Sequence, residues 1–380
     1  MIGALNKASS LHRARGYRMI EAAEIQNFRG FKDVQLSNLA RVNVVVGDNG
    51  AGKTALLEAL FFAAVSNADV AQRFRVWRGV DAPSATGSPQ ELYDGFFLDL
   101  FYQFNKECVP LISLTGSKQD SRSLRFYYSK PEPTVLPFKE TQQEPSHAYT
   151  PITFEWKAAD GHVTTVTPHL QPGGLAFPPP SQLRHDPAFL AARAPLPTSQ
   201  NARWFSEQIS KWGREERFIA RVQAQFKHVQ SLNVEVDMGN PVIFVKVPWL
   251  DRKMPIYLTS DGLNKLVTLL LHIVHCEGTA LFVDEIENGF HFSRHQRLWE
   301  QLLTFAEEYE TQLFVTTHSW ECLNAAAPLI ERLPDDFAMI QVYEENGLGK
   351  AVVVPGRRAA AAIENEIEVR GNGGGHAPQA

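Results

Sequence analysis

The feature that most constrains this chain is a glycine-rich octapeptide, Gly47-Asp48-Asn49-Gly50-Ala51-Gly52-Lys53-Thr54. It fits the pattern G-x-x-x-x-G-K-[ST] and stands between an apolar β-branched run, Val42 to Val46, and a helical pattern from Lys53 to about Ser66. Glycines let backbone N–H groups converge on phosphate oxygens, and the following helix adds the positive end of its dipole. A chance match in a glycine-rich turn is the alternative, and the flanking strand and helix argue against it.

Two side chains of this loop carry its chemistry. In loops of this pattern the lysine, here Lys53, bridges the β- and γ-phosphates, and the hydroxyl of the next residue, Thr54, ligates Mg²⁺. We therefore expect ATP and Mg²⁺ as cofactors, with all residues from Gly47 to Thr54 forming the nucleotide-binding element.

A pair of carboxylates, Asp284 and Glu285, directly follows the apolar run Leu281-Phe282-Val283. Ligands of open α/β sheets bind at the carboxyl ends of the strands, where this pair would emerge. We expect Asp284 to hold the magnesium, directly or through water, and Glu285 to orient and deprotonate the attacking water. The string is weak alone, but together with the phosphate loop it predicts hydrolysis of ATP.

Two further strings complete the set of motifs. A buried strand pattern ends at His318, one β–α–β unit after the carboxylates, and we expect this histidine to sense or polarise the γ-phosphate. A structural role is the usual one for a lone histidine. Ser260 and Gly262 open a helix, where an N-cap is the ordinary interpretation. The alternative is a second phosphate-binding element, supplied by another subunit.

These four elements, in this order, resemble the ABC-type ATPase heads of the SMC, RecF and OLD-like families. Within that group the chain is most similar to small bacterial ATPases of the AAA-15 and AAA-21 types. The resemblance covers about residues 19 to 370. It rests also on three stretches: Ile25-Gln26-Asn27-Phe28-Arg29-Gly30-Phe31, Asp284-Glu285-Ile286-Glu287-Asn288-Gly289-Phe290-His291 and Thr316-Thr317-His318-Ser319-Trp320.

The resemblance implies roles for individual residues. Thr54 and Asp284 would carry magnesium, Glu285 would be the base, His318 the switch histidine and Ser260 the signature serine. It also implies an ATP-dependent homodimer that holds two nucleotides between its subunits. For the glutamine that such heads place between their lobes, the sequence offers only Gln103 as a guess.

The expected architecture is an α/β P-loop fold with an ABC-ATPase-like head. It has a mixed, largely parallel core sheet, an N-terminal antiparallel lobe and an inserted α+β region. We divide the chain into a disordered extension (1–18), the N-terminal lobe with the phosphate loop (19–66), the insertion (67–200), the C-terminal ATPase half (201–356) and a tail with a disordered end (357–380).

Several local patterns refine this architecture. Within the insertion, Leu111 to Leu114 and Leu124 to Tyr128 are strand candidates. Further on, one helical face is predicted to pack into the core, and it carries Trp204, Phe205, Gln208 and Trp212. Strands are also predicted around 232–238 and 242–247, and a final hairpin at 337–354.

Composition sets limits on location and partners. The net charge of −5 excludes a dominant non-specific grip on nucleic acid, so DNA contact would need a local patch such as Arg73, Arg75 and Arg78. These arginines fit a solvated edge equally well. The three cysteines match no zinc or disulfide pattern, and no apolar run of about 18 residues exists, so we expect a cytoplasmic protein without a membrane span.

Three functions remain open at this point. The first is an ATPase whose ATP state gates a separate effector, such as a nuclease in phage defence. The segment after His318 is too short for a nuclease domain and holds no acidic cluster of metal-ligand form, so cleavage of DNA would belong to a partner. The second is a RecF-like, DNA-associated ATPase in replication or repair. The third is a P-loop kinase, which would have no use for Ser260 or His318.

Overall fold

The computed structural model describes residues 19–80, 88–116, 120–129, 149–171, 174–177 and 187–365. The expected N-terminal extension and the expected disordered end of the tail lie outside these residues. Within the described ranges, no helix is both long and apolar enough to cross a bilayer.

A six-stranded core sheet forms the centre of the structure, in the order β10-β14-β15-β3-β16-β17. The first five strands run parallel, and β17 returns antiparallel to β16. Strands β3, β14 and β15 are buried along their whole length, as strands covered on both faces should be. The largely parallel core sheet predicted from the sequence is therefore confirmed. Its strands are β3 Val42–Val46, β10 Ala188–Leu190, β14 Ala280–Val283, β15 Gln312–Thr316, β16 Phe337–Glu345 and β17 Leu348–Pro355.

A second sheet of six strands, all antiparallel, has the order β2-β1-β4-β5-β6-β7. Both strand candidates of the insertion lie in it, as β4 and β5, and they extend the pair that β1 and β2 form. The Gly349 amide donates to the Gly30 carbonyl (3.2 Å), so the β16–β17 hairpin adjoins this lobe. The strands are β1 Ile20–Phe28, β2 Phe31–Ser37, β4 Leu111–Gly116, β5 Ser121–Tyr128, β6 Ile152–Lys157 and β7 Val163–Val166.

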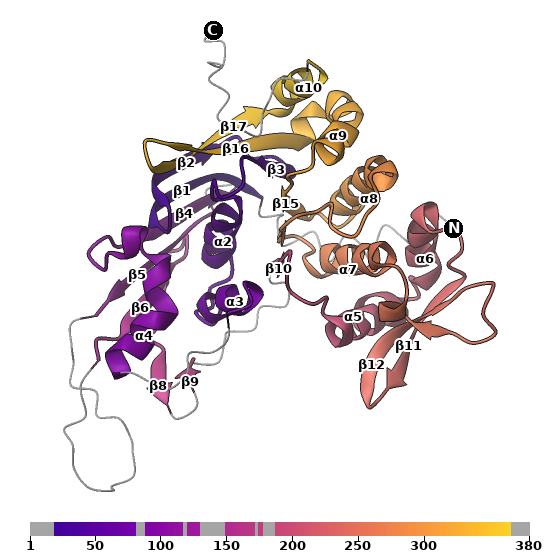
Figure 1. Cartoon of the computed structure of the whole chain (residues 1–380), viewed down its shortest axis with the longest axis horizontal. Helices are drawn as coiled ribbons and strands as arrows, with labels where there is room; N and C mark the ends of the chain where they lie inside the picture. The colour runs from indigo at the N-terminus through magenta and orange to yellow at the C-terminus, as the bar shows by residue number, and fades with distance from the viewer. Residues whose placement is uncertain are drawn as a thin grey trace, which may run out of the picture.

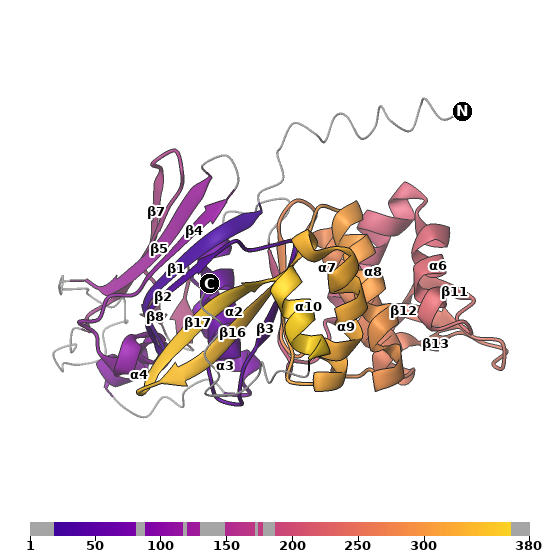
Figure 2. The same ribbon diagram turned by 90° about the horizontal axis from the view of Figure 1, so that it is seen from above.

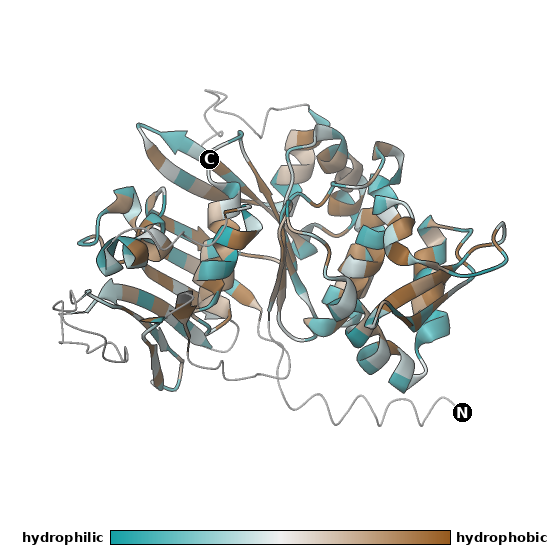
Figure 3. Ribbon diagram, turned by 60° about the horizontal axis from the view of Figure 1, so that its bottom comes forward, coloured by the Kyte–Doolittle hydropathy of each residue, from teal (hydrophilic) through white to brown (hydrophobic). Residues whose placement is uncertain are grey.

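Helices cover both faces of the core sheet (Figures 1 and 2). Alternate residues of β3 show this: Val45 packs with the helices α2 and α3, whereas Val44 packs with α7, α8 and α9. Figure 3 shows the central strands as hydrophobic where they pass between these layers. Helices α2 and α7 therefore lie on opposite faces of the sheet. The helices named here are α2 Lys53–Ala64, α3 Val70–Trp77, α7 Asp261–His275, α8 His295–Glu308 and α9 Trp320–Arg332.

Helix α10 lies beside α9, and the other remaining elements sit at the two ends of the molecule (Figure 1). Helix α4 and the short pair β8–β9 belong to the antiparallel lobe side, while α5, α6 and a three-stranded sheet, β11-β12-β13, lie beyond α7. Their bounds are α4 Pro89–Phe97, α5 Thr198–Trp204, α6 Glu215–Gln225, α10 Gly356–Glu364, β8 His169–Gln171, β9 Gly174–Ala176, β11 Ser231–Asp237, β12 Asn240–Lys246 and β13 Met254–Pro255.

Two local expectations differ from the structure. Trp212 was expected on the buried face of one helix, but it is 66% exposed. The chain changes there from α5 to a π-helical turn, Phe205–Ile209, and then to a 3₁₀ turn, Ser210–Trp212, which rotates the helical face. The segment taken as a tail begins with helix α10, which buries three apolar side chains against the core, Ala359, Ala360 and Ile363.

Candidate functional site

The phosphate loop, Gly47–Thr54, joins the carboxyl end of β3 to the first turn of α2. Two glycines allow this path. At Gly47, with φ 153°, an added Cβ would lie 2.1 Å from the Val342 carbonyl oxygen. At Gly52, the N-cap of α2 with φ 104°, it would lie 3.0 Å from the Phe31 ring. Neither position accepts a side chain without movement, so glycine is required for a loop that presents backbone N–H groups to an anion.

The ammonium group of Lys53 lies over its own loop. Its Nζ donates to the carbonyl oxygens of Gly47 (2.8 Å) and Asp48 (3.0 Å). Burial lowers the pKa of Lys53 from its ordinary value, and the negative charges of Asp284 and Glu285 act in the opposite direction. Because Lys53 is held by carbonyl oxygens and makes no ion pair shorter than 4.0 Å in the described residues, its charge is placed to neutralise a phosphate group bound by the loop.

Thr54 and Asp284 meet although they come from different parts of the chain. The Thr54 hydroxyl donates to both carboxylate oxygens of Asp284, at 3.2 and 3.1 Å, and Thr316 donates to one of them at 2.7 Å. Burial raises the pKa of Asp284, while the hydrogen bonds from Thr316 and Thr54 oppose that shift. The structure thus brings together the two residues that the sequence assigned to magnesium.

Glu285 stands at the end of β14 in a left-handed conformation, with φ 52°. Its backbone N–H donates to the Thr316 hydroxyl (2.7 Å), and its side chain accepts a hydrogen bond from the Asn288 amide (2.6 Å). Non-glycine residues in this region are strained by about 1–3 kcal/mol and persist where the surroundings fix them. The side chain of Glu285 remains 39% exposed, so its carboxylate is both oriented and accessible.

His318 lies near the carboxylates that follow β14, and the nearest of them is Glu287. Its Nδ1 is 3.1 Å from Glu287 and 3.9 Å from Glu285. The buried Glu287 carboxylate also accepts the backbone N–H groups of His318 (3.0 Å) and Ser319 (3.2 Å). Glu287 therefore fixes the turn that carries the histidine.

Ser260 and Gly262 stand at the start of α7, on the other side of the core sheet from α2. The exposed Ser260 caps its own helix by accepting the Leu263 amide (3.4 Å), which is the N-cap geometry. The buried Gly262 packs against the turn after the carboxylates, where an added Cβ would lie 2.7 Å from the Gly289 carbonyl oxygen. The structure brings this element to the carboxylate turn of the same chain.

Two residues at this site were missed as functional residues by the sequence reasoning. Thr316 and Glu287 both lie inside quoted motifs, yet their hydrogen bonds to Asp284, Glu285 and the His318 turn follow only from the fold. The available signals were a hydroxyl at the end of a buried strand and a second acidic residue two positions after Glu285.

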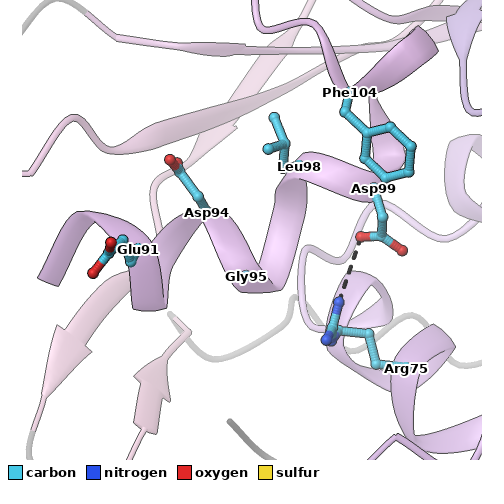
Figure 4. A pocket seen from close by; sticks show the side chains of 7 residues that line it. All are labelled: Arg75, Glu91, Asp94, Gly95, Leu98, Asp99 and Phe104. Atoms are coloured by element: carbon cyan, nitrogen blue, oxygen red, sulfur yellow. Dashed lines mark ion pairs between the residues drawn. The ribbon is translucent and has the colours of Figure 1, made fainter. Parts of the chain in front are cut away.

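The guess at Gln103 gains no support from its contacts. The side chain is exposed, and its amide donates to the hydroxyl of the preceding residue, Tyr102 (3.2 Å). It lies next to Phe104, which lines a pocket of about 410 Å³ on the antiparallel lobe side (Figure 4). The other residues around this pocket are Arg75, Glu91, Asp94, Gly95, Leu98 and Asp99.

Each of the three arginines considered for DNA faces a carboxylate. Arg73 pairs with Asp69 (2.7 Å) and Arg78 with the buried Glu58 (2.7 Å). The remaining one, Arg75, lies 3.7 Å from Asp99, the contact drawn in Figure 4. These carboxylates reduce the local positive charge on which a DNA-binding patch would depend.

The donor set at Thr54 and Asp284 fits Mg²⁺. In the ranges that the structure describes, no group of three or more His, Cys, Asp or Glu residues could hold a metal ion. Magnesium in nucleotide sites needs no such cage, because one or two protein oxygens and the substrate phosphates usually suffice. The hydroxyl and the carboxylate, 3.1–3.2 Å apart, are hard oxygen donors of the required kind.

A protein-family model matches residues 42–324, which are most of the chain. The family is AAA-21, described as "AAA domain, putative AbiEii toxin, Type IV TA system". The matched range begins at β3 and includes the phosphate loop, the carboxylates and the histidine.

Known proteins show related sequences and structures. An ATP/GTP phosphatase of Helicobacter pylori is 23% identical over 348 residues, 84% of this chain and 90% of that protein. A DNA replication and repair protein RecF of Idiomarina loihiensis is 48% identical over 42 residues, 11% of this chain and 12% of that protein. A structure of an SMC head bound to the C-winged helix domain of ScpA has 15% identity and a TM-score of 0.47, covering 90% of this chain and 99% of that one.

Proposed function

Since the chain belongs to the AAA-21 family of AbiEii toxin-type AAA domains and is an ATPase, we propose that two copies bind Mg·ATP between them and that hydrolysis gates a partner effector. The observation that carries the catalytic part is the contact of Thr54 on the phosphate loop with Asp284, directly after β14, with Glu285 next in sequence.

The geometry supports the following roles. The loop Gly47–Thr54 binds the phosphates, with Lys53 neutralising their charge. Thr54 and Asp284 hold Mg²⁺, which would supply charge neutralisation and orientation of the phosphate oxygens. Glu285, oriented yet accessible, takes the proton of the attacking water, and His318 senses the γ-phosphate. The Glu287 contacts support this by fixing where the histidine stands.

The position of Ser260 supports a site shared between two copies. Ser260 is an exposed residue at the start of α7, and α7 and α2 cover opposite faces of the core sheet. One copy would therefore offer its phosphate loop and the other its Ser260 helix. A two-fold symmetric dimer repeats this contact twice and closes, which makes it the simplest assembly of this type. ATP would then favour the dimer by linkage.

Two substitutions test the catalytic proposal. Lys53→Ala should abolish ATP binding in calorimetry, whereas Lys32→Ala on the exposed surface of β2 should leave it unchanged. Glu285→Gln should bind ATP but hydrolyse it about 10²–10⁴-fold more slowly, because the amide cannot accept a proton. Glu300→Gln, on the exposed side of α8, is the matched control. Unchanged affinity in the lysine variant, or wild-type turnover in Glu285→Gln, would refute the assignments.

The effector part is supported by the family description, which names a toxin and a type IV toxin–antitoxin system. Glu285→Gln should hold the ATP-bound dimer, so a dedicated partner should co-purify with it in ATP and not with Lys53→Ala. The activity of that partner should differ between the two variants. Full biological activity from this chain expressed alone would contradict gating of a separate effector.

A RecF-like role at DNA is the second candidate, favoured by the 42-residue match to RecF. The ion pairs of Arg73, Arg75 and Arg78 weigh against it. Its test is salt-dependent binding of duplex DNA with ATP, with ADP and without nucleotide. Absence of binding under all three conditions excludes this role.

A further inference from the structure

A buried lysine on α7 contacts the peptide that carries the proposed base. Lys265 is 8% exposed and stands on α7 one turn after the Ser260 cap. Its Nζ donates to the backbone carbonyl of Glu285 at 3.3 Å. A lysine is rarely buried this deeply without partners.

This contact completes a set that fixes the Glu285 residue. Its N–H is held by Thr316 (2.7 Å) and its carboxylate by the Asn288 side chain (2.6 Å). Its carbonyl accepts from the Asn288 backbone N–H (3.2 Å) and from Lys265 (3.3 Å). With φ 52°, the residue needs such support from its surroundings. Three of these four hydrogen bonds come from the same sheet edge, whereas the one from Lys265 comes from α7.

Charge gives a reason for a lysine at this position. Burial lowers the pKa of Lys265, and the carboxylates of Glu287, Asp284 and Glu285 act in the opposite direction. One oxygen of Glu287, Oε2, is buried and has no hydrogen-bond partner in the described part of the chain. A positive charge among these carboxylates offsets their mutual repulsion, which a neutral side chain cannot do.

The start of α7 also packs tightly on the carboxylate turn. The close approach of Gly262 to the Gly289 carbonyl leaves no room for a side chain between helix and turn. A shift of the α7 N-terminus would therefore be transmitted to the turn, since packed elements move together rather than deform. Lys265 is the polar link from this helix to the Glu285 backbone.

We propose that Lys265 is a positioning residue that couples the Ser260 end of α7 to Glu285 in the same copy. This inference rests on the proposed function, in which Ser260 meets the nucleotide of the other copy. When the Ser260 helix of one copy binds the nucleotide held by the other copy, Lys265 positions the Glu285 backbone beside the first copy's own nucleotide. Each site is therefore activated when the neighbouring site closes.

Three variants of the full chain test this coupling. Lys265→Met removes the charge and the donor, Lys265→Arg keeps both, and Lys246→Met is the matched control. Lys246 on β12 donates to the carbonyl oxygens of Leu250 and Asp251, so it makes the same kind of contact with the loop after its own strand, away from the site. ATP affinity, thermal stability, ATP-dependent dimerisation and kcat are measured for each, with kcat followed over protein concentrations that span dimer formation.

The expected results distinguish a positioning role of Lys265 from a general effect of its substitution on folding. Lys265→Met should bind ATP within about twofold of wild type and still dimerise, while its kcat falls about tenfold or more. Its specific activity should no longer rise as the dimer forms. Lys265→Arg should recover much of the rate, and Lys246→Met should keep it. If Lys265→Met does not fold, Lys265→Gln, whose shorter side chain also ends before the Glu285 carbonyl, is judged by the same measurements.

Two outcomes would overturn the coupling. One is a wild-type rate with a normal concentration dependence in Lys265→Met. The other is a loss of kcat in Lys265→Met that is explained by its loss of thermal stability and is no larger than the loss of kcat in Lys246→Met. Failure of the proposed function is distinguishable, because Lys53→Ala would then keep its ATP affinity or wild-type protein would not dimerise with ATP.

Discussion

Thr316 allows a quantitative test of how Asp284 and Glu285 are held, because its hydroxyl makes a hydrogen bond to each of these two residues. Its Oγ1 donates to Asp284 and accepts the Glu285 N–H, each at 2.7 Å, and the side chain is 1% exposed. Thr316→Val keeps the shape of the side chain and removes both hydrogen bonds. The carboxylate loses one of its donors, and the strained peptide loses its acceptor.

The magnitude follows from these two contacts. A hydrogen bond to a charged group contributes about 1.5–3 kcal/mol, and an N–H left without an acceptor costs about 1–3 kcal/mol. Water at the accessible edge of the site can restore part of the second contribution. We therefore expect the free energy of unfolding to fall by about 2–4 kcal/mol. Because the carboxylates lose their anchor, kcat should fall about 10- to 100-fold and the Mg²⁺ concentration for half-maximal rate should rise.

Urea denaturation and kcat against Mg²⁺ concentration measure both effects. The control is Thr268→Val on α7, a fully buried threonine whose hydroxyl donates to Asn264 and accepts from Asn201, both at 2.8 Å. It should lose comparable stability and keep its kcat and Mg²⁺ dependence. If Thr316→Val is destabilised in the same way but also keeps both kinetic values, the reasoning about the carboxylates is refuted.

Two further predictions concern pH and the dimer. Burial lowers the pKa of His272 to about 3 in the folded chain. As the pH falls, the unfolded chain therefore takes up this proton first. Below about pH 6.5 the free energy of unfolding should fall by about 1.4 kcal/mol per pH unit. Denaturation of wild type and His272→Gln between pH 7 and 5 checks this, and parallel curves would contradict it. A mixture of inactive Lys53→Ala and Ser260→Arg gives heterodimers with one intact site. If the two sites work independently, the mixture should regain part of the ATPase activity, whereas the Lys265 coupling predicts that it stays inactive, because the neighbouring site holds no nucleotide. A mixture that stays inactive although heterodimers form would mean that Ser260 acts in its own copy or that both sites must be intact.

The sequence was most informative where local pattern and chemistry coincide. The phosphate loop required glycines at fixed positions, and strands β3, β14 and β15 are short, mostly apolar runs, as in a parallel sheet covered on both faces. The parallel order then placed Asp284 and His318 at one edge. The family resemblance and the ATPase activity were predicted correctly from these motifs.

The parts that were not predicted depend on contacts between distant segments. Strand β10 has three residues, too few for a periodic signal, yet it pairs with β14 and accepts the Asp284 amide through Leu190 (2.8 Å). Lys265 resembles any polar residue on a helix until its carbonyl partner is known. Trp212 follows the helical period in sequence, but the π-helical turn before it breaks that period.

The left-handed backbone at Glu285 has a consequence for engineering. Glycine or asparagine adopts this conformation more readily, so a search for thermostable variants would favour them at position 285 and eliminate the carboxylate. Sequence design guided only by the backbone would make the same choice. Stabilisation of this protein should therefore keep position 285 unchanged and draw its gains from surfaces far from the sheet edge.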